Sequence, residues 1–291
     1  MKKIHEPVLK KEVIQYLKPE ANKNFVDCTA GGGGHSLALL DKVKPDGKVI
    51  AIEFDPDLAQ RLREKEEENL IVVNDSYINL KNIVKENGFD KVDGVLLDIG
   101  MSSWHLENSE RGFSFQKEEK LDMRYNPEVQ NLTAKDIVNK YPKNDLIGIL
   151  EDYGEERFAN RISKEIVEER KRKEINTTKD LIETIKKAVP SFYIRKRIHF
   201  ATRTFQALRI EVNRELSNLK KVLPQAIERT KPEGRVAVIS FHSLEDRIVK
   251  NFFKNNNKVK VLTKKPISAS DKEVKKNPRS RSAKLRVVEI K

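Results

Sequence analysis

Short runs of β-branched and aliphatic residues recur along this chain, and polar segments with helical periodicity separate them. Such runs are typical of buried strands, because they have apolar side chains on both faces. They predict strands at residues 25–30, 48–54, 70–74, 94–100 and 235–241. Helices are predicted between the first four of these strands, at residues 36–43, 56–68 and 77–87. Strand and helix alternate three times, so we expect parallel strands joined by right-handed crossovers, as in a doubly wound α/β sheet.

The same pattern predicts how the chain ends. A predicted helix at residues 244–253 is followed by strand patterns at 258–263 and 285–290, which bring the total to seven strands. We expect these last two strands to form a hairpin with a long basic excursion, residues 264–284, between them.

More than 130 residues separate the fourth and fifth predicted strands, which is several times what one crossover helix needs. This stretch has no strand pattern of comparable quality. Its helical patterns lie at residues 133–140, 155–172, 178–188 and 201–223. We therefore predict an inserted all-helical domain at residues 106–209, with the first part of the sheet domain at 1–105 and its second part at 210–291.

Composition narrows the class of protein. The chain has 291 residues, of which 37% are hydrophobic and 35% are charged, as in soluble globular proteins. No apolar run approaches the roughly 18 residues that span a bilayer, so we expect no membrane contact. The basic start has no apolar stretch after it, which argues against a secretory signal. A single cysteine, Cys28, fits a reducing compartment, and we expect a cytoplasmic protein.

The net charge of +13 indicates an anionic partner, most often nucleic acid. Two blocks of sequence account for the whole excess of positive charge. Residues 260–291 have eleven Lys or Arg against three acidic residues, and residues 191–214 have six against one. A solvated lysine-rich surface is the alternative interpretation.

A glycine-rich turn follows the first strand, in the pattern Asp27-x-Thr-x-Gly-Gly-Gly-Gly. Glycines there let the backbone turn tightly and approach a ligand closely. The turn is not a Walker loop, since no Gly-Lys-Ser/Thr follows, and Ser36 replaces the third glycine of a dinucleotide fingerprint. Glu53 ends the second strand twenty residues after Gly33, where an acidic side chain accepts hydrogen bonds from ribose hydroxyls. Together these features predict a nucleoside-type cofactor.

NAD and S-adenosylmethionine both satisfy this geometry. The helical insertion and terminal hairpin stand where a dinucleotide fold needs a second parallel half, which favours S-adenosylmethionine. The third strand ends in residues 74–77, where a polar residue could read adenine and Tyr77 could pack on its face. The fourth strand ends in Asp98, followed by a loop of small residues to His105. We take this loop as the candidate reaction centre.

Several long strings of residues then resemble one family, the bacterial S-adenosylmethionine-dependent methyltransferases that modify cytidine N4 in small-subunit ribosomal RNA. The strings are HEPVL at His5, DCTAGGGGHS at Asp27, RGFSF at Arg111, LDMR at Leu121, HFATRTFQALRIEVNREL at His199, ISFHSLEDR at Ile239 and NPRSRSAKLR at Asn277. The resemblance covers nearly the whole chain. It implies a Rossmann-like methyltransferase sheet with a helical insertion, a cytidine of the decoding (P-site) region of 16S RNA as substrate, and a small ribosomal subunit as context.

The resemblance also implies site residues. The family's cofactor contacts fall on Gly33, Gly34, His35, Glu53, Tyr77, Asp98 and His105. Three positions depart from the usual pattern: Glu53 stands for Asp, Tyr77 for Phe and His105 for Gln. The last departure bears most on the assignment, and a surface loop histidine is the alternative interpretation of this position.

The residues leave two roles open for Asp98. It could accept the hydrogens of the target amine, or it could contact only the methionine part of the cofactor. Basic residues of both blocks are predicted to bind RNA phosphates: Arg203, Arg209, Arg214, Arg279, Arg281, Lys284 and Arg286. Arg209 could instead hold the insertion by hydrogen bonds. His242 could face the target base or be a structural loop histidine.

Other classes of protein fit less well. The five histidines have no zinc-ligand spacing with Cys28, so no metal site is expected. The sequence has no GxSxG elbow, the motif that would indicate an α/β-hydrolase. A non-catalytic RNA-binding assembly factor and a nicotinamide oxidoreductase are the remaining alternatives, and titrations with each cofactor would separate them.

Overall fold

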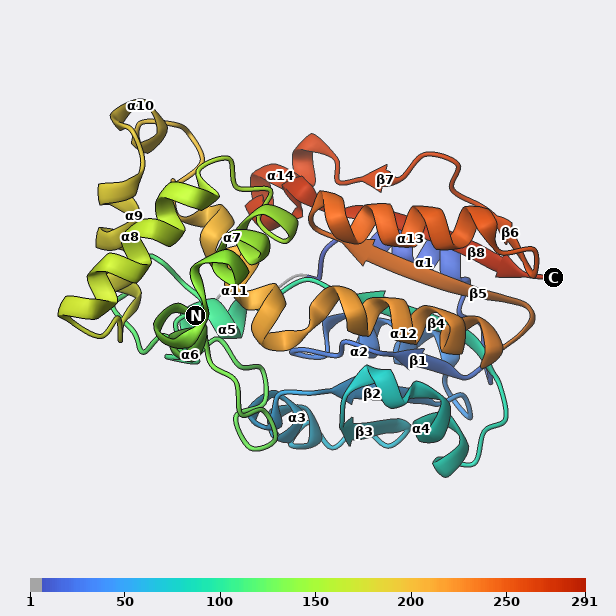
Figure 1. Cartoon of the computed structure of the whole chain (residues 1–291). Coiled ribbons are helices and arrows are strands. Elements are labelled where there is room, and N and C mark those ends of the chain that lie inside the picture. Colours follow the sequence, from blue (N-terminus) through green and yellow to red (C-terminus); the bar gives the residue numbers. More distant parts are fainter. Residues whose placement is uncertain (1–6) are drawn as a thin grey trace. The chain divides into compact units, whose positions relative to one another are not determined.

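The computed structural model describes residues 7–291, so His5 and Glu6 of the HEPVL motif lie outside the described residues. The chain divides into two compact units, Met1–Gly100 with Leu216–Lys291, and Met101–Glu215 (Figure 1). The sheet lies in the first unit, and the second unit contains the segment expected as the helical insertion.

The first unit contains one mixed sheet with the strand order β3-β2-β1-β4-β5-β8-β6. In that order the strands are Leu70–Asn74, Val49–Glu53, Phe25–Asp27, Val92–Asp98, Thr230–Ser240, Lys284–Ile290 and Val259–Val261. The first five strands pair in parallel, and β8 runs antiparallel to both β5 and β6. The predicted Rossmann-like sheet is confirmed. The excursion between β6 and β8 adds a two-residue strand, β7 (Ile267–Ser268), which also pairs with β8.

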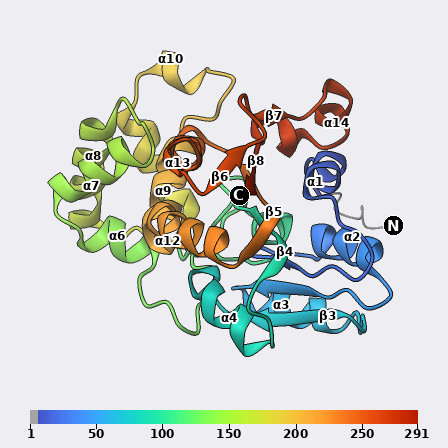
Figure 2. The same ribbon diagram turned by 90° about the vertical axis from the view of Figure 1, so that its right-hand side faces the viewer.

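Helices cover both faces of this sheet, because neighbouring residues of each buried strand point to opposite sides. Val26 belongs to a core with residues of α4 (Leu80–Glu86), α12 (Glu215–Glu228) and α13 (Ser243–Asn255). Phe25 packs with residues of α1 (Lys10–Leu17) and α2 (Gly34–Val43). Figure 2 shows α12 and α13 on one side of β5 and α1 and α2 on the other. The helices of this unit are α1 Lys10–Leu17, α2 Gly34–Val43, α3 Pro56–Arg63, α4 Leu80–Glu86, α12 Glu215–Glu228, α13 Ser243–Asn255 and α14 Asp271–Lys276, with 3-10 turns η1 Tyr77–Asn79 and η2 Pro278–Ser282.

The second unit is helical around its own apolar core. Its helices are α5 Ser103–Glu107, α6 Ala134–Lys140, α7 Lys143–Asp152, α8 Ala159–Arg172, α9 Thr178–Ala188, α10 Ser191–Ile194 and α11 Thr202–Asn213. Two of them begin at capping boxes, Thr133 with Asp136 and Thr177 with Asp180, in which each side chain bonds the other residue's backbone N–H. Helices α5, α7 and α10 were not predicted. Helices α5 and α10 have only five and four residues, whereas the apolar spacing of Leu146, Ile149 and Leu150 could have indicated α7.

The single helix predicted at residues 201–223 is wrong. The structure has two helices, α11 and α12, because Arg214 between them takes a left-handed conformation with φ 51°. The break is held by side chains on either side of it. Asn213 Nδ2 donates to the Met123 carbonyl at 2.8 Å, and Arg209 forms a bidentate pair with Glu215 at 2.9 and 3.0 Å.

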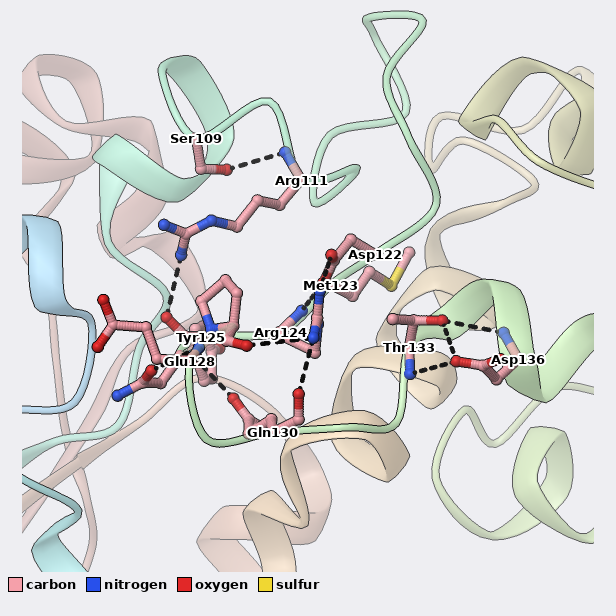
Figure 3. A network of polar contacts seen from close by, with 12 residues as sticks. Ser109, Arg111, Asp122, Met123, Arg124, Tyr125, Glu128, Gln130, Thr133 and Asp136 are labelled. Carbon is pink, nitrogen blue, oxygen red and sulfur yellow. Dashed lines mark hydrogen bonds and ion pairs between the residues drawn. The ribbon is translucent and has the colours of Figure 1, made fainter.

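The LDMR string lies in a long loop before α6, and its polar groups are used inside the fold (Figure 3). Arg124 donates to both carboxylate oxygens of Asp122 at 2.8 and 2.7 Å and to the Gln130 carbonyl at 2.7 Å. Arg111 Nη1 donates to the Tyr125 carbonyl at 3.0 Å. These bonds replace regular secondary structure along the loop, since an arginine fork can satisfy several acceptors at once.

Candidate functional site

Four polar side chains stand at the carboxyl edge of the parallel strands. Asp27, Glu53, Asn74 and Asp98 are the last residues of β1, β2, β3 and β4. Glu53 lies opposite Asn74 in the strand register. Ligands of open α/β sheets bind at this edge, where the strand order reverses. The topology therefore assembles at one place residues that the sequence separates by more than seventy positions.

The glycine turn leads from β1 into α2 at this edge. Gly31 and Gly33 have φ values of 52° and 85°, which disfavour residues with a side chain. A Cβ on Gly33 would also lie 2.5 Å from Leu62 Cδ1, whereas one on Gly32 would meet nothing within 4 Å. Gly33 thus serves the turn, and Gly32 leaves open space beside it.

Glu53 is held by the turns around it. Its carboxylate accepts backbone N–H groups of Gly31 at 2.7 Å and of Asp55 at 2.8 Å. Only 8% of the residue is exposed, and this burial raises its pKa from 4.5 to about 7 although both hydrogen bonds oppose the shift. Asn74 Nδ2 donates to the Glu53 carbonyl at 2.8 Å, which joins the ends of β2 and β3.

Tyr77 begins the 3-10 turn after β3 and is half-buried against the core that contains α4. Ser76 caps this turn, with its hydroxyl accepting the Ile78 N–H at 3.4 Å. The capped turn therefore fixes the backbone of Tyr77 at the same sheet edge as Asn74.

A cluster of polar residues lies around the end of β4. Thr29 Oγ1 accepts the Asp98 N–H at 2.7 Å, and His35 Nε2 lies 3.4 Å from Asp98 Oδ2. Asp27 is fully buried and accepts the Ser36 hydroxyl at 2.7 Å. Burial raises the pKa of Asp27, and the nearby His35 and the Ser36 hydrogen bond oppose that rise.

Two residues of this group carry buried polar atoms without a hydrogen-bond partner in the part of the chain that the structure describes. The atoms are Asp98 Oδ1 and the two ring nitrogens of His35, and His35 is 5% exposed. Unpaired buried polar atoms are costly, so their concentration here marks a place where a polar ligand is expected.

His105 lies in the second unit and is buried there, at 4% exposed. Its ring packs against Phe113 and Tyr125 with centroid distances of 5.0 and 4.8 Å, and against the edge of Trp104 at 5.5 Å. Arg111 lies over the Trp104 ring at 5.3 Å. The alternative of a surface loop histidine is wrong, because this aromatic cluster encloses the imidazole.

The predicted RNA-binding cations have different surroundings. Arg209 pairs with Glu215 at 2.9 and 3.0 Å. Arg286 pairs with Asp246 at 2.6 and 3.2 Å, and 9% of the Arg286 side chain is exposed. Lys284 also reaches Asp246, at 3.5 Å. The guanidinium groups of Arg209 and Arg286 are thus engaged inside the fold. Arg203, Arg214 and Arg281 are exposed and Arg279 is half-buried, and the Arg203 guanidinium donates to the Glu155 carbonyl.

His242 has a structural contact. Its Nε2 lies 3.0 Å from Glu245 Oε1 at the start of α13, and Glu245 Oε2 accepts the backbone N–H of Phe241 at 2.8 Å. This arrangement matches a helix N-terminus held by its own first turn.

Within residues 7–291, no helix combines the length and apolar character needed to cross a bilayer.

Sequence reasoning missed Thr29, although it stands inside the motif that drew attention to the glycines. The signal was a hydroxyl residue two positions after Asp27, which ends the buried strand β1. Its partner, the backbone of Asp98, is 69 residues away, so only the folded sheet identifies the contact.

The strand order and this carboxyl-edge site define an S-adenosylmethionine-dependent methyltransferase of the Rossmann type. The chain belongs to the MraW methylase family, whose model matches residues 2–291. Two similar relatives are named ribosomal RNA small subunit methyltransferase H. The protein of Thermosipho melanesiensis is 49% identical over 98% of this chain and 97% of its own length. That of Thermotoga neapolitana is 46% identical, over 98% and 96%.

One solved structure, a putative rRNA-methylase from Clostridium thermocellum, aligns with 99% of this chain and 100% of its own, at 11% identity and a TM-score of 0.49. The fold assignment rests on the strand order of this chain and not on that likeness.

The residues at the edge fit S-adenosylmethionine. Glu53 offers a carboxylate for a ribose diol, and Asp98 Oδ1 offers a buried acceptor for a cationic amine. The open space at Gly32 leaves room beside the turn.

Proposed function

We propose that this chain transfers a methyl group from S-adenosylmethionine to the N4 amine of a cytidine in the decoding (P-site) region of small-subunit ribosomal RNA. The observation that carries the proposal is the unpaired carboxylate oxygen of Asp98 beside the buried His35, at the sheet edge of a chain in a methylase family. The names of the relatives supply the RNA class, and the motif resemblance supplies the cytidine and its atom.

When bound, S-adenosylmethionine supplies an electrophilic methyl group on a sulfonium. Glu53 is suited to its ribose hydroxyls, the glycine turn to close backbone approach, and the Tyr77 ring to the adenine face. These assignments follow from the strand ends on which the residues stand. The cofactor contact at His105 follows from the motif resemblance alone and stays a prediction.

Asp98 has the chemistry needed at the target amine. The cytosine amine is a poor nucleophile because its lone pair is delocalised into the ring. A carboxylate that accepts an amine hydrogen localises this pair and stabilises the positive charge that develops. Contact with the cofactor's amine alone is the competing role, and both roles use the same Oδ1 atom.

His35 and Thr29 act on Asp98 as positioning residues. Thr29 fixes the Asp98 backbone through its hydroxyl, and His35 stands beside the Oδ2 atom. The Thr29 hydrogen bond fixes the backbone at Asp98, and Oδ1 is left unpaired for a ligand. Holding the methyl donor and the amine in one geometry can lower a barrier by roughly 7 to 11 kcal/mol, and a fixed Asp98 would contribute to that geometry.

The target cytidine must be unstacked before it can reach a site at a sheet edge. We propose that the helical unit, Met101–Glu215, is the RNA-recognition module, with exposed cations such as Arg203 and Arg214 contacting phosphates. Exposed Arg281 serves the same purpose in the first unit, with Arg279 beside it in sequence. The substrate is either free small-subunit RNA or the assembled subunit.

The test is labelled methyl transfer to unmodified small subunits and to naked small-subunit RNA, followed by nucleoside analysis. N4-methylcytidine at one decoding-region position is the expected product. Calorimetry with S-adenosylhomocysteine and with NAD is run in parallel. Binding of NAD alone would support the oxidoreductase alternative, and binding of S-adenosylhomocysteine without methyl transfer to either substrate would support a non-catalytic RNA-binding factor.

A further inference from the structure

Residues 192–198, here called the tip segment, form an exposed turn at the end of α10 in the helical unit. Phe192 and Ile198 are 56% and 65% exposed, although large apolar side chains are usually covered. Between them stand three exposed cations in a row, Arg195, Lys196 and Arg197. Figures 1 and 2 show α10 and the loop after it at the outer edge of the helical unit.

The tip segment is anchored. Tyr193 is 7% exposed, and its hydroxyl donates to Glu156 Oε2 at 2.8 Å. Burial and the neighbouring carboxylate raise the pKa of Tyr193 to about 12, so the phenol stays a neutral donor. Its ring meets the edge of Phe158 at 4.9 Å. The flanking side chains therefore project from a fixed base, which lowers the entropy cost of binding.

Cations lie against aromatic faces at this turn. The exposed Arg157 stands 4.7 Å from the centre of the Phe158 ring and 5.6 Å from that of Phe192. Lys196 Nζ stands 5.3 Å from the centre of the Tyr193 ring. Aromatic faces interleaved with cations are the usual surface for single-stranded nucleic acid, in which bases stack while phosphates are neutralised.

The charges of the tip segment are not used inside the protein. Among residues 7–291, no side-chain hydrogen bond or ion pair engages Arg195 or Arg197, and Lys196 has only its ring contact. No acidic residue occurs between positions 189 and 210. Arg209 and Arg286, by contrast, are paired with carboxylates.

We propose that the tip segment docks single-stranded or loop RNA, with its three cations on phosphates and Phe192 against a base. The proposal rests on the function above, since it names the surface by which the helical unit holds its substrate. Charge complementarity selects a polyanion, and the exposed ring beside the cations selects one that carries bases.

The first experiment compares two triple variants with equal loss of charge. R195Q/K196Q/R197Q removes the tip cations, and K171Q/R172Q/K173Q removes three consecutive cations from the end of α8. Lys171 and Lys173 are already paired with Glu168 and Asp180, at 2.9 and 2.8 Å. Binding of unmodified small-subunit RNA is measured against salt concentration. The tip variant should lower the log–log slope by about 2, since each phosphate contact on a single strand contributes roughly 0.7, and the control by clearly less than 1.

The second experiment tests the ring. Phe192→Ala should weaken RNA binding roughly tenfold, as expected for one stacked base. Val129→Ala, which shortens another exposed apolar side chain of the same unit, should leave affinity unchanged. Melting temperatures of all variants establish that each is folded.

A tip variant with the wild-type salt slope overturns the proposal. So does one that binds naked RNA normally and only assembled subunits weakly, because the contact would then be with a protein. S-adenosylhomocysteine affinity separates this outcome from failure of the proposed function. The tip variants should bind S-adenosylhomocysteine as the wild type does. A wild-type protein that does not bind it would refute the proposed methyl-transfer function, and the salt slopes would still test RNA binding by the tip segment.

Discussion

Glu53 is a carboxyl group that the fold keeps partly protonated near neutral pH. Its pKa rises from 4.5 to about 7, chiefly because burial penalises the charged form. The folded protein therefore holds a proton that the unfolded chain releases. The stabilisation is complete below the unfolded pKa and is lost as pH rises through the folded one, so stability should fall across this interval.

The size of the effect follows from the shift. A displacement from 4.5 to about 7 corresponds to about 3 kcal/mol, at roughly 1.4 kcal/mol for each unit. Glu53→Gln removes the titration but leaves one of the two N–H groups, of Gly31 or Asp55, facing an amide nitrogen. That loss costs about 1 to 3 kcal/mol at every pH. The variant should thus be less stable at low pH and close to or above the wild type at high pH.

Urea unfolding of the cofactor-free protein at several values between about pH 5 and pH 8 measures this. The difference in unfolding free energy between wild type and Glu53→Gln should change by about 2 to 3 kcal/mol over that range. Glu68→Gln, an exposed site with the same loss of charge, is the control and should leave the wild-type profile unaltered. A Glu53→Gln profile parallel to that of the wild type would refute the burial argument.

Three other changes test separate parts of the structure. Asp98→Asn should reduce methyl transfer by about a hundredfold or more, since it removes the carboxylate charge at the reacting end; near wild-type turnover with unchanged S-adenosylhomocysteine affinity would exclude both of its roles. Arg286→Ala should lower the unfolding free energy by about 1 to 3 kcal/mol because it leaves Asp246 with only Lys284, at 3.5 Å, and it should not change the salt slope of RNA binding; a reduced slope would return Arg286 to the RNA surface. Gly33→Ala should cost about 1 to 3 kcal/mol because φ is 85°, whereas Gly32→Ala should cost little; equal melting temperatures would contradict the strain argument.

Much of the first unit could be predicted because its strands are continuous apolar runs, and the central ones, β1, β2 and β4, are buried almost throughout. Residues 70–74 were predicted with the bounds of β3, and the other parallel strands overlap their predictions, since a continuous apolar run leaves few alternatives. Helix ends were harder. The predicted helix at 56–68 ends at Arg63, where the following turn places Glu66 in a left-handed conformation that no periodicity encodes.

The candidate site was predictable as a set of strand ends but not as a set of contacts. Glu53 and Asp98 could be named because ligands of parallel sheets bind at the carboxyl edge. The environment of Asp98 could not, because Thr29 and His35 reach it from another part of the chain. The raised pKa of Glu53 likewise arises from burial, which the sequence pattern does not give.

By itself the amino-acid sequence determined the alternation of strands and helices, the glycine turn, the acidic strand ends and the placement of the excess charge, since each is written in local pattern. The tertiary structure alone decided which charges remain for a partner. Arg209 and Arg286 lie in the same basic blocks as Arg195 and Arg281, yet only the first two meet carboxylates. An ion pair depends on the separation of two side chains in space, and residues that are distant in sequence acquire that separation only when the chain folds.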